Sequence, residues 1–511
     1  MTDRTPVLVG LTQILQREDD PHLAREPVEL MTQAVRDALA DAGVSELLQK
    51  VSALRVIKGI WGYKNPAAQV REALGLGLVE TGLSVLGGNH VQMVLNQSAI
   101  DLQEGRHDVI VLAGAECGRT LGRAQKAELD VPWLEESDLG PAPDVVYGTD
   151  KWTRHDAEMA LGIQRAVHYY SLFEIALRHA RGESPDEHLQ RISELWAQFN
   201  RVAQNNPSAW IRSPISAEEI RTASPRNRAI TYPYTKFMNA NMRVDMASAL
   251  VLTTVGTAKA LGISEERFVF PWSGTDAYDH YFVSERDDLH SSPAVRLAGS
   301  RALGLAQVDA SDLDFVDLYS CFPSAVQVAA KELGLEDRSR LSVTGGLTFG
   351  GGPLNNYVMH SIARTAELLR ETNSGKALVT ANGGMLTKHS FGVYGREPSG
   401  RPFLHENLQE EVDALPKREV AASHDGAATI ESYVVVFGGG PAKPTKSANA
   451  IYGKAAESGS EPTLAHLACR LDDGRRTWAN LTDRDVLGAL CEEEFCGRTV
   501  LLQDGSDAQV V

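Results

Sequence analysis

Apolar and polar positions along this chain repeat one pattern twice. In each copy a glycine turn precedes a stretch with helical spacing of apolar residues, and an uninterrupted apolar run follows. The two copies are Gly87-Gly88-Asn89, His90 to Glu104 and Val109 to Gly114, and then Gly350 to Pro353, Asn356 to Arg370 and Ala377 to Ala381. Such spacing predicts a helix, and such a run predicts a buried strand. A duplicated α/β unit favours a pseudo-symmetric domain with its site between the halves.

The segments before the first copy follow the same alternation. Strands are predicted at Pro6 to Leu11 and at Val51 to Ile57, and helices at Pro27 to Ala42 and at Asn65 to Leu74. Asn65 followed by proline is typical of a helix start. Strands that alternate with helices predict fold class α/β, with a largely parallel sheet covered on both faces.

Residues 118–240 depart from this rhythm, because apolar strand runs are scarce there. Helices are predicted at Gln164 to Arg181 and at Pro185 to Gln204, so we interpret the segment as a helical lid. The predicted domains are an N-terminal half (1–117 and 241–267), the lid (118–240), a C-terminal half (268–417) and an additional domain (418–511).

The additional domain has the pattern of a small β-rich, OB-like barrel. A strand at Ile430 to Phe437 precedes a hairpin around Asp472-Asp473-Gly474, a helix at Asp483 to Cys491 and a strand at Gly497 to Gln503. The sequence leaves open whether Ile430 to Phe437 closes the main sheet instead. Ala442 to Pro462 is expected to be a linker or hairpin loop.

Composition narrows the function classes. The chain has 511 residues and a formal net charge of −17, which argues against a nucleic-acid partner. No apolar run has the length of a membrane span, and the N-terminus has no secretory pattern. The five cysteines lack metal-type spacing, so no metal site is predicted. A reducing, cytoplasmic location is the simplest expectation.

Four motifs occur in the order found in the thiolase superfamily. They are Gly87 to Glu116, Asp317-Leu318-Tyr319-Ser320-Cys321-Phe322, Gly345 to Pro353, and Asn382-Gly383-Gly384. Residues 5–440 resemble thiolases of the sterol-carrier-protein type, and the tail resembles that of thiolase-like proteins of type 1. The resemblance implies a five-layer α-β-α-β-α fold, a role in lipid metabolism within the acetyl-CoA acetyltransferase-like class, and coenzyme A thioesters as ligands, with no covalently bound cofactor.

The resemblance also shows what the chain lacks. The family's nucleophilic cysteine falls on Gly88, and the histidine of its Gly-His-Pro turn falls on Gly352. The second catalytic cysteine falls near Ala381 or Asn382. Classical thiolase activity is therefore expected to be weak or absent.

Several residues remain as candidates for binding a coenzyme A thioester. Asn89 is expected to cap the following helix while the amides after Gly87 and Gly88 point into the cavity and bind an anion or oxyanion. The remaining members of this predicted binding set are His90, Gly351, Gly352, Asn382, Gly383 and Lys388. Close packing of the glycine turn, a structural His90 and a solvated Lys388 are the alternatives.

The candidate catalytic residues are Tyr319, His389 and Cys321. Tyr319 stands where the family has a histidine, and a related group of steroid side-chain aldolases also has tyrosine there and works with a β-barrel partner. Tyrosine can donate a proton but is a poor base at neutral pH. His389 follows the Gly383-Gly384 turn and is the best acid or base candidate. A buried, satisfied phenol and a core thiol remain the alternatives for Tyr319 and Cys321.

Three functions stay open at this point. The chain is an acyl-CoA-binding thiolase-like protein, a retro-aldol lyase acting on a steroid or fatty β-hydroxyacyl-CoA through Tyr319, or a non-catalytic scaffold. Basic and aromatic residues at Lys151 to His155 and at Tyr232 to Lys236 would suit an adenine nucleotide, or form a solvated face. A monomer and a thiolase-type homodimer are both possible, since the appended domain could cover a sheet edge otherwise used for pairing.

Overall fold

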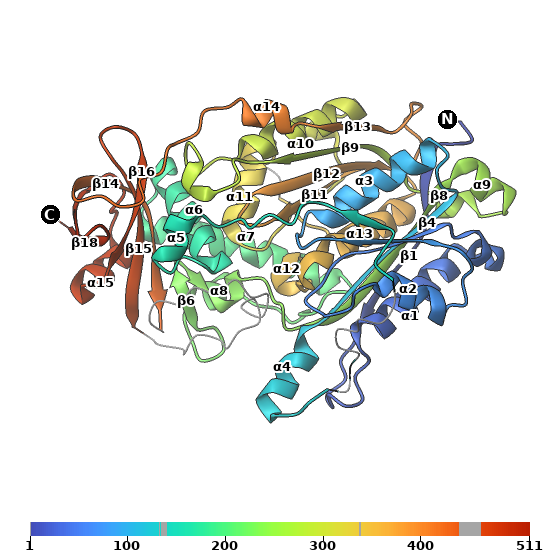
Figure 1. The fold of residues 1–511 in the computed structure, drawn as a ribbon, viewed down its shortest axis with the longest axis horizontal. Helices are drawn as coiled ribbons and strands as arrows, with labels where there is room; N and C mark the ends of the chain where they lie inside the picture. The colour runs from blue at the N-terminus through green and yellow to red at the C-terminus, as the bar shows by residue number, and fades with distance from the viewer. Residues whose placement is uncertain (1, 132, 134–140, 337–338, 439–460, 511) are drawn as a thin grey trace.

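The computed structural model describes residues 2–131, 133, 141–336, 339–438 and 461–510, and Figure 1 shows its fold. Within these residues a first sheet has the strand order β1-β8-β4-β2-β3-β5. Its strands are β1 (Pro6–Leu15), β8 (Asp245–Thr254), β4 (Val109–Cys117), β2 (Ala53–Val56), β3 (Glu80–Ser84) and β5 (Val145–Tyr147). Every residue of β4 and β8 is buried, as expected for strands covered on both faces.

The second sheet of the described chain has the order β10-β11-β12-β9-β13. Its strands are β10 (Phe315–Asp317), β11 (Lys376–Gly383), β12 (Lys388–Gly395), β9 (Phe270–Tyr278) and β13 (Leu404–Asn407). The prediction of a largely parallel sheet is confirmed in the first sheet only for the pairs between β4 and β5, because β8, like β12 in the second sheet, runs antiparallel to both of its neighbours. The short turn between β11 and β12 permits only an antiparallel pair.

Helices occupy three layers around these sheets. The outer layer of the first sheet holds α1 (Pro27–Asp41) and α2 (Pro66–Ala73), and that of the second holds α10 (Pro293–Ala306). Two helices, α3 (His90–Gln103) and α13 (Tyr357–Thr372), contact both sheets and form the central layer. The predicted five-layer arrangement and its duplicated turn–helix–strand unit are confirmed. The Asn65 side chain accepts from the Ala68 amide, 3.1 Å away, as predicted for a cap.

The remaining helices of the described chain belong mostly to connections and to the segment between β4 and β8. They are α4 (Gly118–Ala127), α5 (Asp156–Ala160), α6 (Ala166–Arg181), α7 (Pro185–Asn205), α8 (Ala217–Arg221), α9 (Val255–Ala260), α11 (Pro323–Glu332), α12 (Gly346–Phe349), α14 (Gln409–Asp413) and α15 (Arg484–Glu492). Residues 118–240 also supply β5 and two short strands, β6 (Ala229–Tyr232) and β7 (Tyr234–Thr235). The domain boundaries themselves stay a prediction.

Five strands of the described tail close into a barrel. They are β14 (Gly426–Phe437), β15 (Pro462–Arg470), β16 (Arg476–Leu481), β17 (Thr499–Gln503) and β18 (Asp507–Val510). The circle closes because β14 pairs with both β15 and β17. The predicted Ile430 to Phe437 strand thus belongs to the barrel and not to a main sheet. Most of the predicted linker, residues 442–462, lies outside the described residues.

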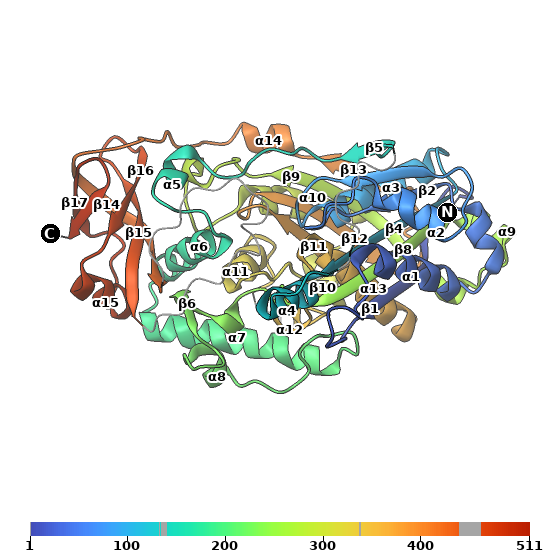
Figure 2. The same cartoon turned by 60° about the horizontal axis from the view of Figure 1, so that its bottom comes forward.

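The barrel lies at one end of the molecule, and the N-terminus lies at the other (Figure 1). Helices α5 and α6 stand between the barrel and the two large sheets in both views, and α7 runs along the lower edge in Figure 2. Strand β6 pairs with β14, so the segment predicted as a lid is joined to the barrel by backbone hydrogen bonds. Among the described residues no helix is long and apolar enough to cross a membrane.

Candidate functional site

Three segments far apart in the chain meet at one small cavity. They are α10, the loop after β10 together with α11, and the hairpin of β11 and β12. The cavity is lined by Val295, Tyr319, Ala325, Ala329, Thr380, Ala381, Asn382, Leu386, His389 and Phe391. Its volume of about 10 Å³ holds one water molecule or one carbonyl oxygen. The sequence-predicted candidates Tyr319, Asn382 and His389 therefore share one cavity.

Gly88 lies directly against the hydroxyl end of the Tyr319 side chain. A Cβ atom on Gly88 would lie 2.5 Å from the Tyr319 hydroxyl oxygen and 3.0 Å from its Cζ, and it would also meet the Asn382 carbonyl. No side chain can stand at position 88 unless these groups move. The space that a nucleophile at position 88 would need is filled by the phenol of Tyr319.

The Tyr319 ring is held in place from two sides. Its backbone amide donates to Thr380 Oγ1 at 2.9 Å, and its ring packs edge-on against Tyr357 with centroids 5.5 Å apart. Burial, and to a lesser extent the nearby Cys321, raise the pKa of Tyr319 well above its usual value. The hydroxyl thus keeps its proton at neutral pH and acts as a hydrogen-bond donor.

Asn382 is oriented by a residue that the sequence analysis did not select. Its Nδ2 donates to the hydroxyl of Tyr170 on α6 at 2.8 Å, and the Leu386 amide donates to the same hydroxyl at 3.0 Å. Asn382 Oδ1 is buried and has no hydrogen-bond partner among the described residues. A buried acceptor left unpaired costs about 1–3 kcal/mol, so this oxygen marks a place where water or a ligand can donate.

His389 faces the cavity beside a buried carboxylate. His389 on β12 lies directly opposite Asn382 on β11, and His389 is 2% exposed. Its Nε2 lies 3.2 Å from the Leu386 carbonyl and 3.5 Å from Asp279 Oδ2. Both neighbours are acceptors, so we assign the ring proton to Nε2, which leaves Nδ1 as the nitrogen able to take a proton.

The surroundings of Asp279 keep its carboxylate ionised. Ser292 Oγ donates to its Oδ2, and the Ala294 amide donates to its Oδ1 at 3.0 Å. Burial acts to raise the pKa of Asp279, but the hydrogen bond from His389 and the charge of Arg286 outweigh it and hold the pKa below its usual value. The carboxylate, 3.5 Å from Nε2, orients the His389 ring.

Arg286 fixes the turn between Asn382 and His389. It is buried, and its Nη2 donates to the carbonyls of Met385 and Leu386, each at 2.8 Å. The Arg286 carbonyl in turn accepts from Arg476 Nη1 on barrel strand β16 at 2.6 Å. The barrel is therefore connected to the cavity through two successive arginines.

Asn89 does not cap α3, contrary to the sequence-based prediction. The residue has helical dihedrals (φ −75°, ψ −20°) and makes no side-chain cap bond. A capping side chain needs an extended backbone at that position. The Asn89 side chain packs instead on the hairpin turn, where its Oδ1 lies 2.6 Å from the place a Cβ on Gly383 would take. A residue other than glycine at 383 would collide with it.

His90 and Lys388 lie together under the 148–149 segment. His90 is fully buried, and burial with the nearby Lys388 lowers its pKa to about 4, so the ring is neutral. Lys388 is only 3% exposed and donates to the Thr149 carbonyl at 3.3 Å. Burial lowers the pKa of Lys388 below its usual value. Lys388 is thus not the solvated lysine that its residue type would favour.

The second glycine turn does not line the cavity. A Cβ on Gly352 would meet the carbonyl oxygens of Asn241 and Leu347, each at 3.2 Å. The Gly352 amide donates to Asn241 at 3.0 Å, and Gly351 packs against Met246 and Trp210. Gly352 is therefore packed tightly against the backbone of Asn241 and of α12.

Two further candidates predicted from the sequence are Cys321 and the Tyr232 to Lys236 segment, and their surroundings are mostly typical of core residues. Cys321 lies 3.9 Å from Asn382 Nδ2, and burial raises the pKa of its thiol to about 12, so it is no thiolate at neutral pH. In the Tyr232 to Lys236 segment, Tyr234 is buried and its hydroxyl donates to Glu174 at 2.5 Å, so this ring offers no free face to a nucleotide. Lys151 packs over the Tyr281 ring at 4.2 Å.

Sequence reasoning missed Tyr170, Asp279 and Arg286. Asp279 directly follows strand β9, and a polar residue at a strand end was a usable signal. Tyr170 lies inside an amphipathic helix, where an aromatic residue is typical of a core position. Nothing in its spacing distinguishes the hydroxyl that contacts Asn382.

Three solved structures have folds similar to that of this chain. A monomeric SCP2-thiolase-like protein type 1 from Mycobacterium smegmatis matches with a TM-score of 0.79, 28% identity and full coverage of both chains. The Ltp2-ChsH2(DUF35) aldolase matches 77% of this chain and 98% of its own, with a TM-score of 0.57 and 20% identity. The dimeric peroxisomal thiolase of Saccharomyces cerevisiae matches 78% of this chain and 98% of its own, with a TM-score of 0.54 and 12% identity.

Two acetyl-CoA acetyltransferases are similar to this chain in sequence. An acetyl-CoA acetyltransferase from Methanocaldococcus jannaschii is 18% identical over 60% of this chain and 72% of its own length. One from Schizosaccharomyces pombe is 32% identical over 29% of this chain, and the match spans only 35% of the yeast enzyme. No family model matches the chain.

Proposed function

This chain belongs to the thiolase superfamily, and we propose that it binds a coenzyme A thioester without forming an acyl-enzyme. The observation behind the proposal is the opposition of Gly88 and Tyr319, which puts a protonated hydroxyl where the family has its nucleophile. Cys321, the nearest thiol to the cavity among the described cysteines, is buried and protonated.

The thioester carbonyl is placed in the cavity beside Tyr319. A neutral phenol donates to a carbonyl oxygen, and the donor strengthens as negative charge develops there. The unpaired Asn382 Oδ1 is free to accept from a second polar group of the ligand, such as a hydroxyl. The ligand thus meets one donor and one acceptor on opposite chain segments.

Calorimetry and intact mass together test this proposal. We expect acetoacetyl-CoA to bind with no increase in protein mass, and Tyr319→Phe to weaken binding by up to about tenfold, which is one lost hydrogen bond. Cys321→Ser should bind as the parent does. An acetyl adduct on the protein, or no binding of any coenzyme A ester, would contradict the proposal.

A second function is favoured by the pair of His389 and Asp279. A base with a carboxylate partner beside a protonated phenol suits retro-aldol cleavage of a β-hydroxyacyl-CoA of steroid or fatty type. His389 would take the β-hydroxyl proton, the Cα–Cβ bond would break, and its electron pair would pass into the thioester enolate held by Tyr319. Protonation of the enolate at Cα returns the proton and yields an aldehyde or ketone plus a shortened acyl-CoA.

Product analysis distinguishes this lyase from a binding protein. With a β-hydroxyacyl-CoA we expect a carbonyl product and a shortened acyl-CoA, and both Tyr319→Phe and His389→Gln should lower kcat about 100-fold or more. Cys321→Ser serves as the matched control, because it alters a cavity neighbour with no role in the reaction. Unchanged turnover in His389→Gln would remove the lyase assignment, and binding with no turnover of any substrate would leave the non-catalytic scaffold.

A further inference from the structure

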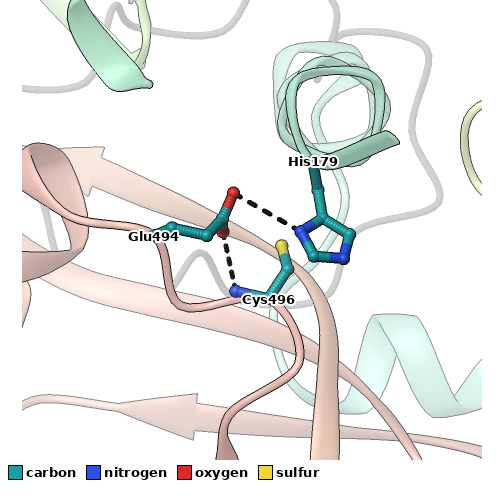
Figure 3. A group of neighbouring side chains, drawn as sticks. All are labelled: His179, Glu494 and Cys496. Carbon is teal, nitrogen blue, oxygen red and sulfur yellow. Dashed lines mark hydrogen bonds and ion pairs between the residues drawn. The ribbon is translucent and has the colours of Figure 1, made fainter. Parts of the chain in front are cut away.

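A histidine, a carboxylate and a thiol converge where α6 meets the barrel. His179 stands in the last turn of α6, and Glu494 and Cys496 follow α15 in the barrel (Figure 3). Each offers one ligand atom, and the three atoms all lie within 4.8 Å of one another. Residues more than 300 positions apart thus present the three side-chain types that bind zinc.

The carboxylate is already oriented toward the imidazole. Glu494 Oε1 accepts from the Cys496 amide at 2.8 Å and from Arg178 Nη2 at 3.2 Å. Its other oxygen, Oε2, lies 3.5 Å from His179 Nδ1. Oε2 and Nδ1 therefore face one another with the Cys496 sulfur nearby, while Arg178 occupies only the oxygen on the far side.

The cluster is half open to solvent, which gives an ion a way in. The His179 side chain is 50% exposed and that of Glu494 is 34% exposed, whereas Cys496 is buried. Three protein ligands and a solvent-facing side are the usual arrangement for a tetrahedral ion that keeps one water. Nitrogen, oxygen and sulfur together favour zinc over magnesium or calcium, which prefer oxygen alone.

We propose that His179, Glu494 and Cys496 bind one divalent cation of the zinc class, with water as the fourth ligand. Binding replaces the Cys496 thiol proton, which passes to solvent, with a sulfur–metal bond. The ion ties the end of α6 to the barrel. Because Tyr170, nine residues earlier on α6, orients Asn382, the ion also steadies the helix that supports the cavity.

Cobalt spectroscopy on the untagged full chain tests the site. After treatment with a chelator and removal of the chelator, we expect one Co²⁺ per chain and a sulfur-to-cobalt charge-transfer band in the near ultraviolet. Zn²⁺ should displace the cobalt and raise the melting temperature. Cys496→Ser should lose the band, and Cys491→Ser, a neighbouring half-buried thiol, should keep it.

His179→Ala decides the matter if the buried Cys496 variant fails to fold. The histidine is half exposed, so its removal leaves the fold intact, and the dissociation constant for Zn²⁺ should rise at least tenfold. Unchanged Zn²⁺ affinity in His179→Ala, a band that persists in Cys496→Ser, or no binding to the parent chain would each overturn the proposal.

Discussion

The hydroxyl oxygen of Tyr319 lies only 2.5 Å from the position that an ideal Cβ on Gly88 would take. The residue type at position 88 and the residue type at position 319 thus restrict each other. A side chain at position 88 requires a different residue at 319, and the tyrosine requires glycine at 88. The space beside position 88 is therefore occupied by the protonated hydroxyl of Tyr319.

Gly88→Ala should destabilise the protein by about 1–3 kcal/mol, the usual cost of an added methyl in a closely packed site. The matched control is Gly304→Ala in α10, where nothing lies within 4 Å of the new Cβ. That control should be neutral or stabilising by up to about 1 kcal/mol, since alanine favours a helix. Urea denaturation of both variants measures the difference.

The same pair can be tested by a double-mutant cycle. In a Tyr319→Ala background, Gly88→Ala should cost less than it does alone, because the phenol no longer blocks the methyl. The relief should be incomplete, since the Asn382 carbonyl also faces position 88. Strict additivity of the two substitutions would show that the residues do not interact.

Tyr170→Phe tests how the cavity is held open. The change removes one hydroxyl and leaves two donors, Asn382 Nδ2 and the Leu386 amide, without their partner. We expect a loss of about 1–3 kcal/mol in the free energy of unfolding, because both donors are buried. Ligand binding should weaken as well, since Asn382 is then free to rotate. Full stability in denaturant would mean that water replaces the hydroxyl.

Periodicity was enough to predict much of the fold. The apolar run at 109–114 and the spacing over 90–104 and 356–370 correspond to β4, α3 and α13, because buried elements leave strong patterns. The direction of β8 was predicted wrongly, since burial on both faces gives antiparallel β8 the pattern expected of a parallel strand. Strand β18, short and mostly exposed, had no apolar pattern to reveal it.

The candidate site was predicted only in part, for a similar reason. Asn382 and His389 flank the Gly383-Gly384 turn, and Tyr319 lies in the Asp317 to Phe322 motif, so their sequence signals are local. Tyr170 joins them through tertiary contact from another segment, and Asn89 adopts helical dihedrals that no residue preference indicated. Contacts between distant segments depend on how the layers stack, and a single sequence does not record that stacking.

Arg476 should be needed for docking the barrel. It is fully buried, forms a two-pronged pair with Glu431 at 2.8 Å on each prong, and donates to the carbonyls of Ser284 and Arg286. Arg476→Lys cannot reproduce this fork, so we expect a loss of about 3–5 kcal/mol, as when a buried pair is broken. Arg475→Lys, on a neighbour whose side chain is 43% exposed, should change stability by less than about 0.5 kcal/mol.

His90 should make stability depend on pH. Burial lowers its folded-state pKa to about 4, below the unfolded value of about 6.5, so the unfolded chain binds more protons between these values. The contribution of this histidine is therefore complete above pH 6.5 and decreases as pH falls toward 4. At pH 5 the loss is about 2 kcal/mol relative to pH 7.5.

The His90→Gln variant isolates this effect. It has no titrating ring, so the difference in unfolding free energy between pH 7.5 and pH 5 should be about 2 kcal/mol smaller than in the parent. Denaturant titrations at the two pH values measure both differences. Equal pH dependence in parent and variant would show that folding leaves the pKa of His90 unchanged.

The chain should be a monomer, because its own β5 covers the β3 edge of the first sheet. The appended domain is not needed for such cover, because residues 145–147 supply it. A strand of three residues offers little edge for another chain to pair with. Light scattering should give one chain mass, 55.5 kDa. Val146→Lys, on an exposed position of β5, should leave that mass unchanged. A parent of twice that mass which Val146→Lys converts to single chains would show that β5 is itself a pairing edge.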